Sequence, residues 1–391
     1  MFYLGIDIGK LHHAAALIDS PGNTVAVLSR FPATAQGFDK LLAFVNQHLP
    51  DTAKLRIGME ASGPYWVSLE QWLTTRGFQP VVLNPLKVAS LRDYGVRGSK
   101  TDRIDAVLIA QAMRWEGSQT VRPAVSTVAA ELRCLTRLRV QVVKERTRAT
   151  LRVGSLLTMV FPEFVSLFPK LASPSALAVL NAACSPGEIL GLGEERLTHI
   201  LRAASRGKLA KDRARQLVTL AKSSVGTVSA ALTQALRLLL AQIHLLREQI
   251  TTLEAQIARM YKAASVPLES LPGTGPILAA ICFSEIGSLH RFSRASQIVA
   301  FSGIDPKLRQ SGTFVGQVRM SKRGSPYLRR AVYLACQSAV RTDPYFKAIY
   351  ERQRQRGKPK RKALGAVMNR FIHVLYAVWR DNRAYSPLTP A

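Results

Sequence analysis

The sequence predicts an α/β domain followed by a long, mainly α-helical region. Residues 2–115 alternate short apolar strands with amphipathic helices, beginning with an antiparallel hairpin. From about residue 125 the apolar residues recur at steps of three and four, which is the spacing of helices that pack against helices. A chain of 391 residues is too long for one typical domain, so two or three domains are expected.

Local patterns predict each N-terminal element in turn. Pro21 and Gly22 separate two apolar runs and indicate a tight hairpin turn. The order of elements fits a ribonuclease H-like domain over roughly residues 1–115. The expected elements are strands at Phe2–Asp7, Ala14–Asp19 and Thr24–Arg30, a helix near Ala35–His48, a strand near Leu55–Met59, a helix near Tyr65–Arg76 and a strand at Pro80–Leu83.

Two apolar stripes run through the middle of the chain. A weaker one within residues 132–156 is interrupted by Arg139 and Arg146. The other continues over four heptads and predicts a coiled coil. Two such helices pair either within one chain or between two chains, and the second alternative predicts self-association through residues 228–260. The second stripe consists of Leu232, Leu236, Leu239, Ile243, Leu246, Ile250, Leu253, Ile257 and Met260.

The charge of the chain predicts a polyanionic partner. The formal net charge is +29, and residues 300–391 alone hold 19 Lys and Arg against four acids. Nucleic acid would neutralise this charge and release counterions. A basic membrane-surface protein is the rival, but no basic amphipathic anchor is evident at either terminus. Residues 160–225 are expected to form a small helical insertion that contacts nucleic acid, and Arg352–Lys362 to form a loop or flexible arm on a phosphate backbone.

The chain is expected to be cytoplasmic and to act on the nucleoid. It shows no run of about 18 apolar residues, and its first residues resemble a strand more than a signal peptide. The four cysteines are far apart in sequence, which argues against a zinc site or a disulfide framework and favours buried thiols.

Four carboxylates in three short motifs predict a divalent-metal site. Asp7 ends the first strand, Glu60 follows the strand near Leu55–Met59, and Asp102 and Asp105 share one face where a helix begins. Mg²⁺ prefers oxygen ligands, and two ions about 4 Å apart stabilise attacking and leaving oxygens together. The alternative is that Asp7 caps a turn, Asp102 caps the helix and the others are surface charges. Lys100, beside Asp102, is a candidate phosphate contact.

Ser311 is the candidate nucleophile, in the glycine- and cation-rich stretch that contains Lys307 and Arg309. A serine hydroxyl needs activation to attack a phosphodiester, and neighbouring cations or metal would stabilise the developing oxyanion. The alternative is an ordinary loop serine. Residues 271–276 resemble the hairpin of a helix–hairpin–helix, whose Gly273 and Gly275 would let backbone amides approach a phosphate. The other candidate phosphate contacts are Lys322, Arg323, Arg329, Arg330, Lys358, Lys360, Arg361 and Lys362.

These motifs, in this order, resemble the transposase family of the insertion-sequence-one-ten type, which includes Piv-like DNA invertases and bridge-RNA-guided recombinases. The resemblance covers residues 1–115 and about 265–380. It is carried by Gly-Ile-Asp, Glu-Ala-Ser-Gly-Pro-Tyr, Asn-Pro, Lys-Thr-Asp-x-x-Asp-Ala, Pro-Gly-Thr-Gly, Ser-Gly and Ser-Lys-x-Gly-x-x-x-Leu-Arg.

The resemblance implies a RuvC-like tetrad of Asp7, Glu60, Asp102 and Asp105 that holds Mg²⁺, and a nucleophilic Ser311 that forms a phosphoserine link to DNA. It also implies donor and target DNA, a noncoding bridge RNA, and self-association as a dimer or tetramer. The expected domains are a RuvC-like domain at 1–120, a helical and coiled-coil region at 121–264, and a C-terminal transposase domain with the serine at 265–391.

Two rival functions stay open at this point. A Holliday-junction nuclease of the RuvC-like kind would use the acids to activate water and would not need Ser311. A non-catalytic nucleic-acid-binding protein would show the same salt-sensitive binding without metal-dependent strand breakage.

Overall fold

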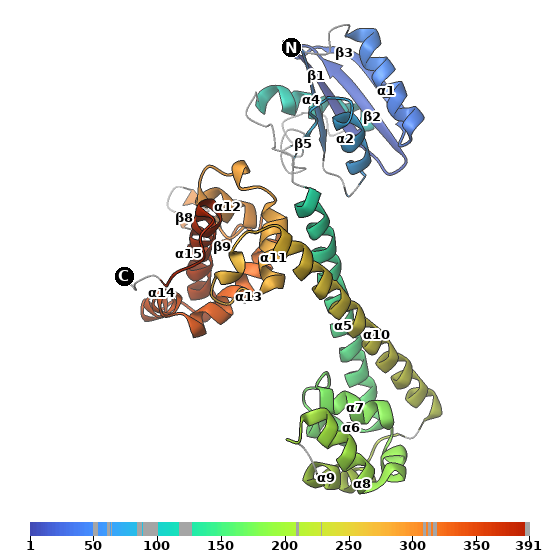
Figure 1. Ribbon diagram of the computed structural model, residues 1–391. Helices are drawn as coiled ribbons and strands as arrows, with labels where there is room; N and C mark the ends of the chain where they lie inside the picture. The colour runs from blue at the N-terminus through green and yellow to red at the C-terminus, as the bar shows by residue number, and fades with distance from the viewer. Residues whose placement is uncertain are drawn as a thin grey trace. The chain divides into compact units, whose positions relative to one another are not determined.

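The computed structural model describes residues 1–49, 54–60, 63, 65–83, 88, 101–116, 127–208, 211–227, 229–307, 310–311, 314–315 and 319–387 (Figure 1). The chain divides into two compact units, Met1–Ala124 and Val125–Ala391. The second unit contains both the helical middle region and the C-terminal region that the sequence predicts as separate domains, and a division at residue 264 stays a prediction.

A five-stranded mixed sheet forms the centre of the first unit. Its order is β3-β2-β1-β4-β5, with antiparallel pairing among β1, β2 and β3 and parallel pairing of β1, β4 and β5. The predicted alternation of strands and helices with an antiparallel start is therefore confirmed. The strands are β1 (Phe2–Ile8), β2 (His12–Ile18), β3 (Thr24–Pro32), β4 (Leu55–Glu60) and β5 (Val81–Leu83).

Helices cover both faces of this sheet. α1 (Ala35–His48) and α2 (Val67–Thr74) share a hydrophobic cluster with Leu4, Ile6 and Ile8 of β1. The bounds of α1 agree with the sequence prediction, because Thr34 Oγ1 accepts a hydrogen bond from the Gly37 amide and caps the helix. α4 (Asp102–Glu116) packs on the opposite face, where the intervening residues of β1 point.

Two long antiparallel helices, α5 (Thr127–Val160) and α10 (Ala230–Ala263), lie side by side in the second unit (Figure 1). Near the start of α5, Leu132 shares a cluster with Ile257 of α10. Further along, Val142 packs with Leu246 and Ile250, and beyond them Val153 lies in the cluster of Leu236. The apolar stripes therefore pair within one chain, which is the intramolecular alternative left open by the sequence.

The polar interruption of the weaker stripe has a partner in this pair. Arg139 Nε donates a 3.0 Å hydrogen bond to Oε1 of Glu254 on α10. Because the residues that form the stripe of α10 are used against α5, self-association would have to use other faces of the two helices. Exposed leucines on those faces include Leu238 and Leu245 of α10.

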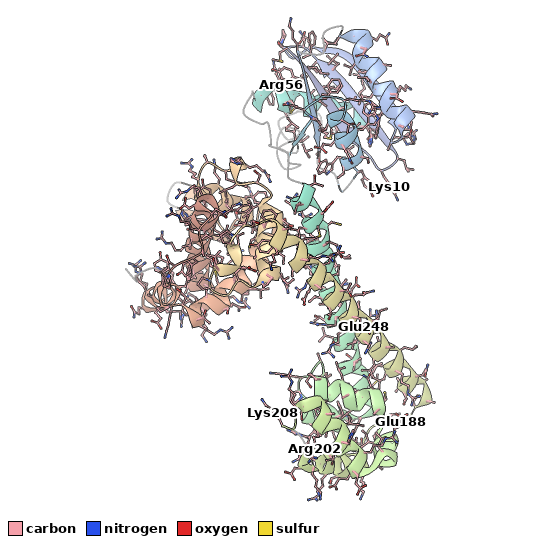
Figure 2. All side chains as sticks on the ribbon, in the orientation of Figure 1. Lys10, Arg56, Glu188, Arg202, Lys208 and Glu248 are labelled. Carbon is pink, nitrogen blue, oxygen red and sulfur yellow. The ribbon has the colours of Figure 1, made fainter. Side chains whose placement is uncertain are left out.

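Residues 161–222 form four helices packed at one end of the α5–α10 pair, so the expected helical insertion is confirmed. Phe164, Leu180, Leu197 and Leu217 contribute to a cluster shared with the ends of α5 and α10. Arg202 and Lys208 are exposed on this segment (Figure 2). The helices are α6 (Pro162–Leu167), α7 (Pro174–Ala182), α8 (Pro186–Ser205) and α9 (Lys211–Lys222).

The C-terminal part of the second unit is a helical bundle with short strands inserted between α12 and α13. Its core contains Cys282, Leu328, Phe346 and Phe371. The elements are η3 (Leu268–Ser270), α11 (Pro276–Ile286), η4 (Leu289–Arg291), α12 (Ala295–Ser302), β6 (Pro306–Lys307), β7 (Gln310–Ser311), β8 (Phe314–Val315), β9 (Arg319–Met320), α13 (Pro326–Thr342), α14 (Pro344–Gln355) and α15 (Lys360–Asp381).

The expectation of a loop or flexible arm at Arg352–Lys362 is wrong for most of that segment. α14 continues to Gln355 and α15 begins at Lys360, so only a short turn separates two helices. Gly357 and Pro359 do break the helix, as expected. Pro359 then precedes the first turn of α15, where proline is tolerated, and the flanking Lys and Arg residues are good helix formers.

The cysteines and the apolar helices can be compared with what the composition predicted. Cys184, Cys282 and Cys336 are buried free thiols, but Cys134 is exposed on α5, so the prediction of four buried thiols is wrong for that residue. No single helix in the described part of the chain is long and apolar enough to cross a membrane. The bent pair of α7 and α8 passes that test of length and composition only when its two helices are taken together.

Candidate active site

Asp7 and Glu60 lie at the same end and on the same face of the sheet. β1 and β4 are parallel neighbours with Gly5 opposite Gly58 and Ile6 opposite Met59, so Asp7 and Glu60 follow at the same level. Side chains alternate between the faces of a strand. Since Ile6 and Met59 point into the cluster beneath α1 and α2, the two carboxylates point to the face that α4 covers.

α4 approaches this face unusually closely because the strands carry very small residues beneath it. A Cβ at Gly5 would lie 2.1 Å from the Ala106 carbonyl oxygen and 2.3 Å from the Ala110 amide nitrogen. A Cβ at Gly58 would lie 2.3 Å from Cγ of Met113. The first turn of the helix is thereby held against the end of β1, next to Asp7.

That first turn contributes the remaining two acids. Asp105 is buried at 4% exposure, whereas Asp102 is exposed. Thr101 caps the helix, since its Oγ1 accepts a 3.3 Å hydrogen bond from the Ile104 amide. The alternative that Asp102 serves as the helix cap is therefore not what the structure shows, and the Thr101 hydroxyl is engaged in the cap.

The other three acids of the set raise the pKa of Asp7. Its pKa is raised to about 6, first by burial and then by repulsion from Asp105, Asp102 and Glu60, while a backbone hydrogen bond from Ile8 opposes the shift. Three acids from two other segments, β4 and α4, therefore act on the Asp7 carboxyl. Lys10 is exposed in the turn that follows β1 (Figure 2), and Lys100 lies outside the described residues.

The donor set fits a hard divalent cation in its chemistry. Carboxylate oxygens are the ligands that Mg²⁺ prefers, and a cation would remove the repulsion that raises the pKa of Asp7. The described acidic side chains are not as close together as the ligands of one bound ion. Within the described ranges no group of three or more His, Cys, Asp or Glu side chains is placed to hold one ion.

The backbone places Ser311 at the end of a short hairpin. β7 pairs with β8, with Ser311 opposite Phe314. A second pair, β6 with β9, brings Lys307 opposite Arg319. Arg309 lies outside the described residues, as do the side chains of Ser311 and Lys307. The candidate serine is thus the last residue of the short strand β7.

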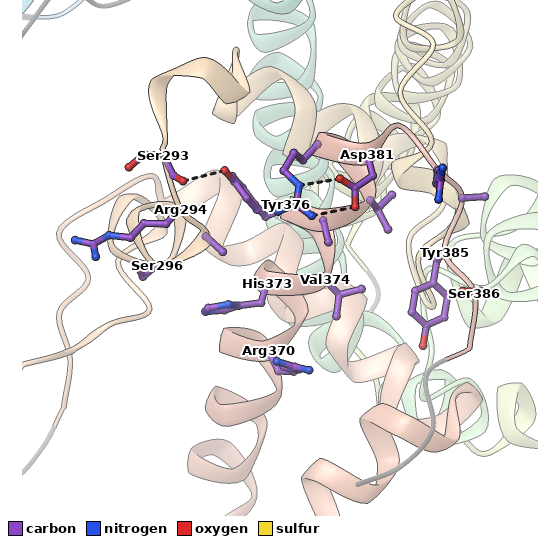
Figure 3. Close-up of a pocket in the computed structure, with 16 residues that line it drawn as sticks. Ser293, Arg294, Ser296, Arg370, His373, Val374, Tyr376, Asp381, Tyr385 and Ser386 are labelled. Atoms are coloured by element: carbon purple, nitrogen blue, oxygen red, sulfur yellow. Dashed lines mark hydrogen bonds and ion pairs between the residues drawn. The ribbon is translucent and has the colours of Figure 1, made fainter.

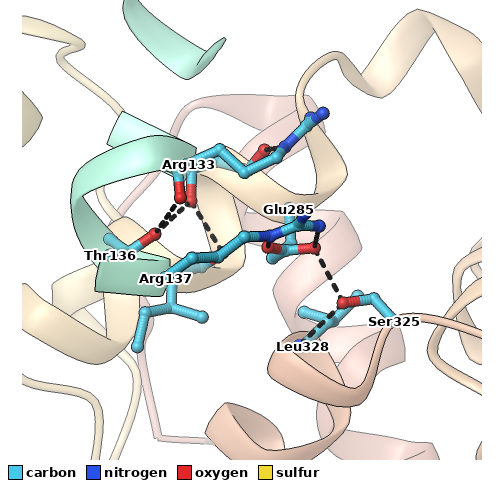
Figure 4. Close-up of polar contacts among 8 residues, drawn as sticks. Arg133, Thr136, Arg137, Glu285, Ser325 and Leu328 are labelled. Atoms are coloured by element: carbon cyan, nitrogen blue, oxygen red, sulfur yellow. Dashed lines mark hydrogen bonds and ion pairs between the residues drawn. The ribbon is translucent and has the colours of Figure 1, made fainter. Parts of the chain in front are cut away.

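The segment after this hairpin is fixed to α11 and α5 by a buried carboxylate (Figure 4). Glu285, at 2% exposure, accepts hydrogen bonds from Arg137 Nε at 2.7 Å and from Ser325 Oγ at 2.7 Å. Ser325 Oγ also caps α13 by accepting from the Leu328 amide at 3.1 Å. Glu285 was not among the residues that the motifs singled out. The available signal was its position inside an apolar helix, because a lone acid there needs a partner.

The predicted cations of residues 322–330 divide into two groups. Arg329 is half-buried and its Nη1 donates a 2.9 Å hydrogen bond to the Ser302 carbonyl oxygen, so this guanidinium already has a structural partner. Lys322, Arg323 and Arg330 are exposed. Lys358, Lys360, Arg361 and Lys362 are exposed as well, around the turn between α14 and α15.

The two glycines of the predicted helix–hairpin–helix have different surroundings. Gly273 has a φ of 76°, and a Cβ there would lie 2.3 Å from the Ala335 carbonyl oxygen of α13. Packing within the bundle therefore requires this glycine. Gly275 is exposed at the start of α11, with open space around its Cα. Gly275 therefore has free space beside it, whereas Gly273 does not.

A cationic cavity in the C-terminal bundle lies outside the set that the sequence singled out. It has a volume of about 790 Å³ and is lined by Arg294, Arg370, Arg380 and Arg383 (Figure 3). The missed signal was the spacing of Arg370, His373 and Arg380, which repeats along one face of a helix.

Comparison with known proteins supports the arrangement of two separate motif regions. Residues 4–162 match the family described as "Transposase", and residues 266–351 match the family described as "Transposase IS116/IS110/IS902 family". The first match contains the acid-bearing sheet and α4, and the second contains Ser311 and Glu285.

Relatives align along almost the whole chain. The uncharacterized 43.6 kDa protein of insertion element IS110 from Streptomyces coelicolor is 27% identical over 100% of this chain and 96% of its own length. A pilin gene-inverting protein of Moraxella bovis is 24% identical over 98% of this chain and 97% of its own. The transposase for insertion sequence element IS1111A of Coxiella burnetii is 24% identical over 87% of this chain and 82% of its own.

Proposed function

On the premise that the chain carries both domains of the IS110 family of insertion-element transposases, we propose that it is a DNA recombinase that uses two sets of residues. Asp7, Glu60, Asp102 and Asp105 hold Mg²⁺, and Ser311 attacks the DNA backbone. The family implies an enzyme that cleaves and rejoins DNA. The observation that carries the proposal is the placement of Asp7 and Glu60 at the same end of neighbouring parallel strands, with Asp102 and the buried Asp105 in the first turn of α4.

The acids would serve the reaction by charge and position. Asp7 and Glu60 stand at the ends of neighbouring strands, and the buried Asp105 faces them from α4. Bound divalent cations would neutralise negative charge on the scissile phosphate. The close contact of α4 with Gly5 fixes the acids before substrate arrives, so that little reorganisation is needed.

Ser311 would exchange one phosphodiester for another. Its Oγ forms a bond to phosphorus as the bond to a deoxyribose oxygen breaks, and the hydroxyl proton is transferred to the leaving oxygen through solvent. A hydroxyl of the incoming strand then attacks the phosphoserine, restores a DNA phosphodiester and frees the serine. Each step exchanges one P–O bond for another, so no energy-rich cofactor is required.

The partners in this proposal are donor and target DNA, a noncoding bridge RNA and a second copy of the chain. The excess of cations in residues 300–391 supports backbone contacts with both nucleic acids. Self-association as a dimer or tetramer is supported by Leu238 and Leu245 on α10. These leucines are 63% and 54% exposed and lie seven residues apart on one helix face.

Covalent capture tests the chemistry. The chain would be expressed with its own flanking DNA, denatured rapidly, and examined for protein-linked DNA ends in wild type, Ser311→Ala and Asp102→Ala. We expect an adduct in the wild type alone, with DNA binding retained by all three proteins. Arg56→Ala provides a matched control in the first unit, on β4 but away from the acidic end.

Other outcomes distinguish the rival functions. Broken ends without an adduct, insensitive to Ser311→Ala but lost in Asp102→Ala, would establish a water-using nuclease of the junction-resolving kind. Salt-sensitive binding with no breakage in the presence of Mg²⁺ would establish a non-catalytic nucleic-acid-binding protein.

A further inference from the structure

The cavity at the C-terminal end of α15 has an unusually cationic lining. Its walls are α15, the segment that enters α12 and the chain that follows α15 (Figure 3). Arg294, Arg370, Arg380 and Arg383 line it, against a single acid, Asp381. All four arginines are exposed, so their charges face solvent or a ligand instead of the core.

The fold holds the walls of this cavity in place. On α15, Arg370, His373 and Arg380 share one face, while Phe371 and Leu375 on the other face are buried in the bundle. Tyr376 Oη donates hydrogen bonds to the carbonyl oxygens of Phe292 and Ser293, at 3.3 and 3.2 Å. These bonds connect α15 to the segment that enters α12, so the two sides of the cavity keep their separation.

Arg370 is oriented by an aromatic neighbour. Its Nε donates a hydrogen bond to Tyr345 Oη, and its guanidinium carbon lies 5.6 Å from the centroid of the Tyr345 ring. A guanidinium fixed in this way loses less rotamer freedom when it binds an anion. Arg370 is one of the residues that line the cavity.

The local charge calls for an anionic ligand. Arg380 Nε lies 2.7 Å from Oδ1 of Asp381, but both side chains are exposed, and such a pair contributes little to stability. Asp381 is also the last residue of α15, where a negative charge opposes the helix dipole. Arg294 precedes the first turn of α12, whose amides add partial positive charge to the wall.

We propose that this cavity holds the phosphodiester backbone of a single-stranded nucleic acid. Arginine suits phosphate because its planar donors bind two oxygens together. Single-strand sites combine such cations with aromatic side chains, and the half-buried Tyr376 and Tyr385 line this cavity. Its volume of about 790 Å³ is that of a small-ligand site, which accommodates a short stretch of one strand but not a duplex.

A second cavity extends the proposed path of the strand. It has a volume of about 320 Å³, and Arg370 lines it together with Arg352. The two cavities share Arg370, and Gln353 of the second cavity accepts a 2.6 Å hydrogen bond from Lys358 Nζ. We place the strand along the outer face of α15 and on to α14, from Arg383 to Arg352. The assignment rests on the proposed function, because it presumes a nucleic-acid partner.

Fluorescence polarisation of the full chain with a fluorescein-labelled single strand tests this site. The Arg294→Ala/Arg380→Ala/Arg383→Ala variant should weaken binding about tenfold, and should reduce the slope of log K against log salt by about 2. Arg148→Ala/Arg152→Ala/Arg259→Ala is the matched control, since it removes the same charge from exposed positions on α5 and α10. Melting temperatures of both variants should match the wild type.

A substitution that should strengthen binding distinguishes this site from a general loss of positive charge or of folding. Asp381→Asn releases Arg380 and should tighten binding of the single strand about two- to fivefold. The wild type and the triple variant are also titrated with single-stranded RNA, single-stranded DNA and a duplex of the same sequence. If the triple variant loses more affinity for RNA than for DNA, the cavity holds RNA, and the reverse result indicates DNA.

Equal losses in the two triple variants would overturn the site, as would equal losses on duplex and single strand, or weaker binding by Asp381→Asn. A wild-type chain that binds no nucleic acid would overturn the proposed function as well, whereas normal binding with an unaffected cavity variant would overturn the cavity alone.

Discussion

Ser325 and Glu285 share a hydrogen bond of 2.7 Å, although 40 residues separate them in the sequence. Through this bond the segment that follows the Ser311 hairpin is joined to α11, and Arg137 on α5 completes the contact with its own hydrogen bonds of 2.7 and 3.0 Å to the same carboxylate. One buried acid therefore connects three helices of the second unit around the start of α13.

Removal of this carboxylate should destabilise the second unit strongly. Glu285→Ala leaves the half-exposed Arg137 without its partner and Ser325 without an acceptor, so we expect a loss of about 2–3 kcal/mol in the free energy of unfolding. Glu254→Ala is the matched control, because the Glu254 carboxylate, paired with Arg139, is 37% exposed and its removal should cost about 0–1 kcal/mol. Urea unfolding followed by circular dichroism measures both. Similar losses in the two variants would refute a special role for the buried acid.

Gly5 should be essential for the geometry of the acids. In Gly5→Ala the new Cβ would meet backbone atoms of α4, and the helix must shift away from β1. We expect a loss of about 1–3 kcal/mol of stability, together with a marked loss of metal-dependent DNA cleavage. Gly191→Ala, which has open space around it on α8, should be neutral or slightly stabilising. Full cleavage activity in Gly5→Ala would show that the close approach of α4 is not needed.

The pKa of Asp7 predicts a pH-dependent cost in the metal-free protein. Its pKa is about 6 in the folded chain against an ordinary value of 3.8, so the fold disfavours the ionised form. The cost is absent below pH 4, grows between pH 4 and 6, and is complete above that range. Asp7→Asn removes it, and should therefore be more stable than the wild type by about 1–3 kcal/mol at pH 7.5 but nearly equal at pH 4.

Thermal melts of both proteins across this range measure the difference. Comparison of the two cancels the effect of His13, whose pKa burial lowers and whose own contribution to stability is lost as the pH falls below its ordinary value of 6.5. Mg²⁺ at pH 7.5 should raise the melting temperature of the wild type and affect Asp7→Asn much less. A difference between the two proteins that does not change with pH would contradict the assigned pKa.

Self-association should depend on the outer face of α10. Leu238→Glu/Leu245→Glu places two charges on that face while Leu236 and Ile243 still pack inward, so the fold should be retained and a dimer or tetramer lost. Light scattering after size-exclusion chromatography measures the mass. Val225→Glu, at another highly exposed apolar position, is the control. An oligomer that survives the double substitution would place the contact elsewhere.

The sequence by itself determined the local elements and the candidate acids. The predicted helix near Ala35–His48 agrees with α1, and the placement of Asp102 and Asp105 at a helix start was confirmed. These features follow from interactions between residues a few positions apart, such as capping and strand alternation. The break between helices at Gly357 and Pro359 was also confirmed, whereas the predicted length of the loop was wrong.

Only the tertiary structure decided what covers each face. The stripe of α10 predicted an apolar partner, but its identity as α5 of the same chain depends on contacts such as Arg139 with Glu254, 115 residues apart. Gly273 looked like a phosphate contact, and yet the carbonyl of Ala335 is its neighbour. The periodicity of apolar residues indicates which side of a helix or strand is buried. It does not indicate which distant segment or ligand packs against that side.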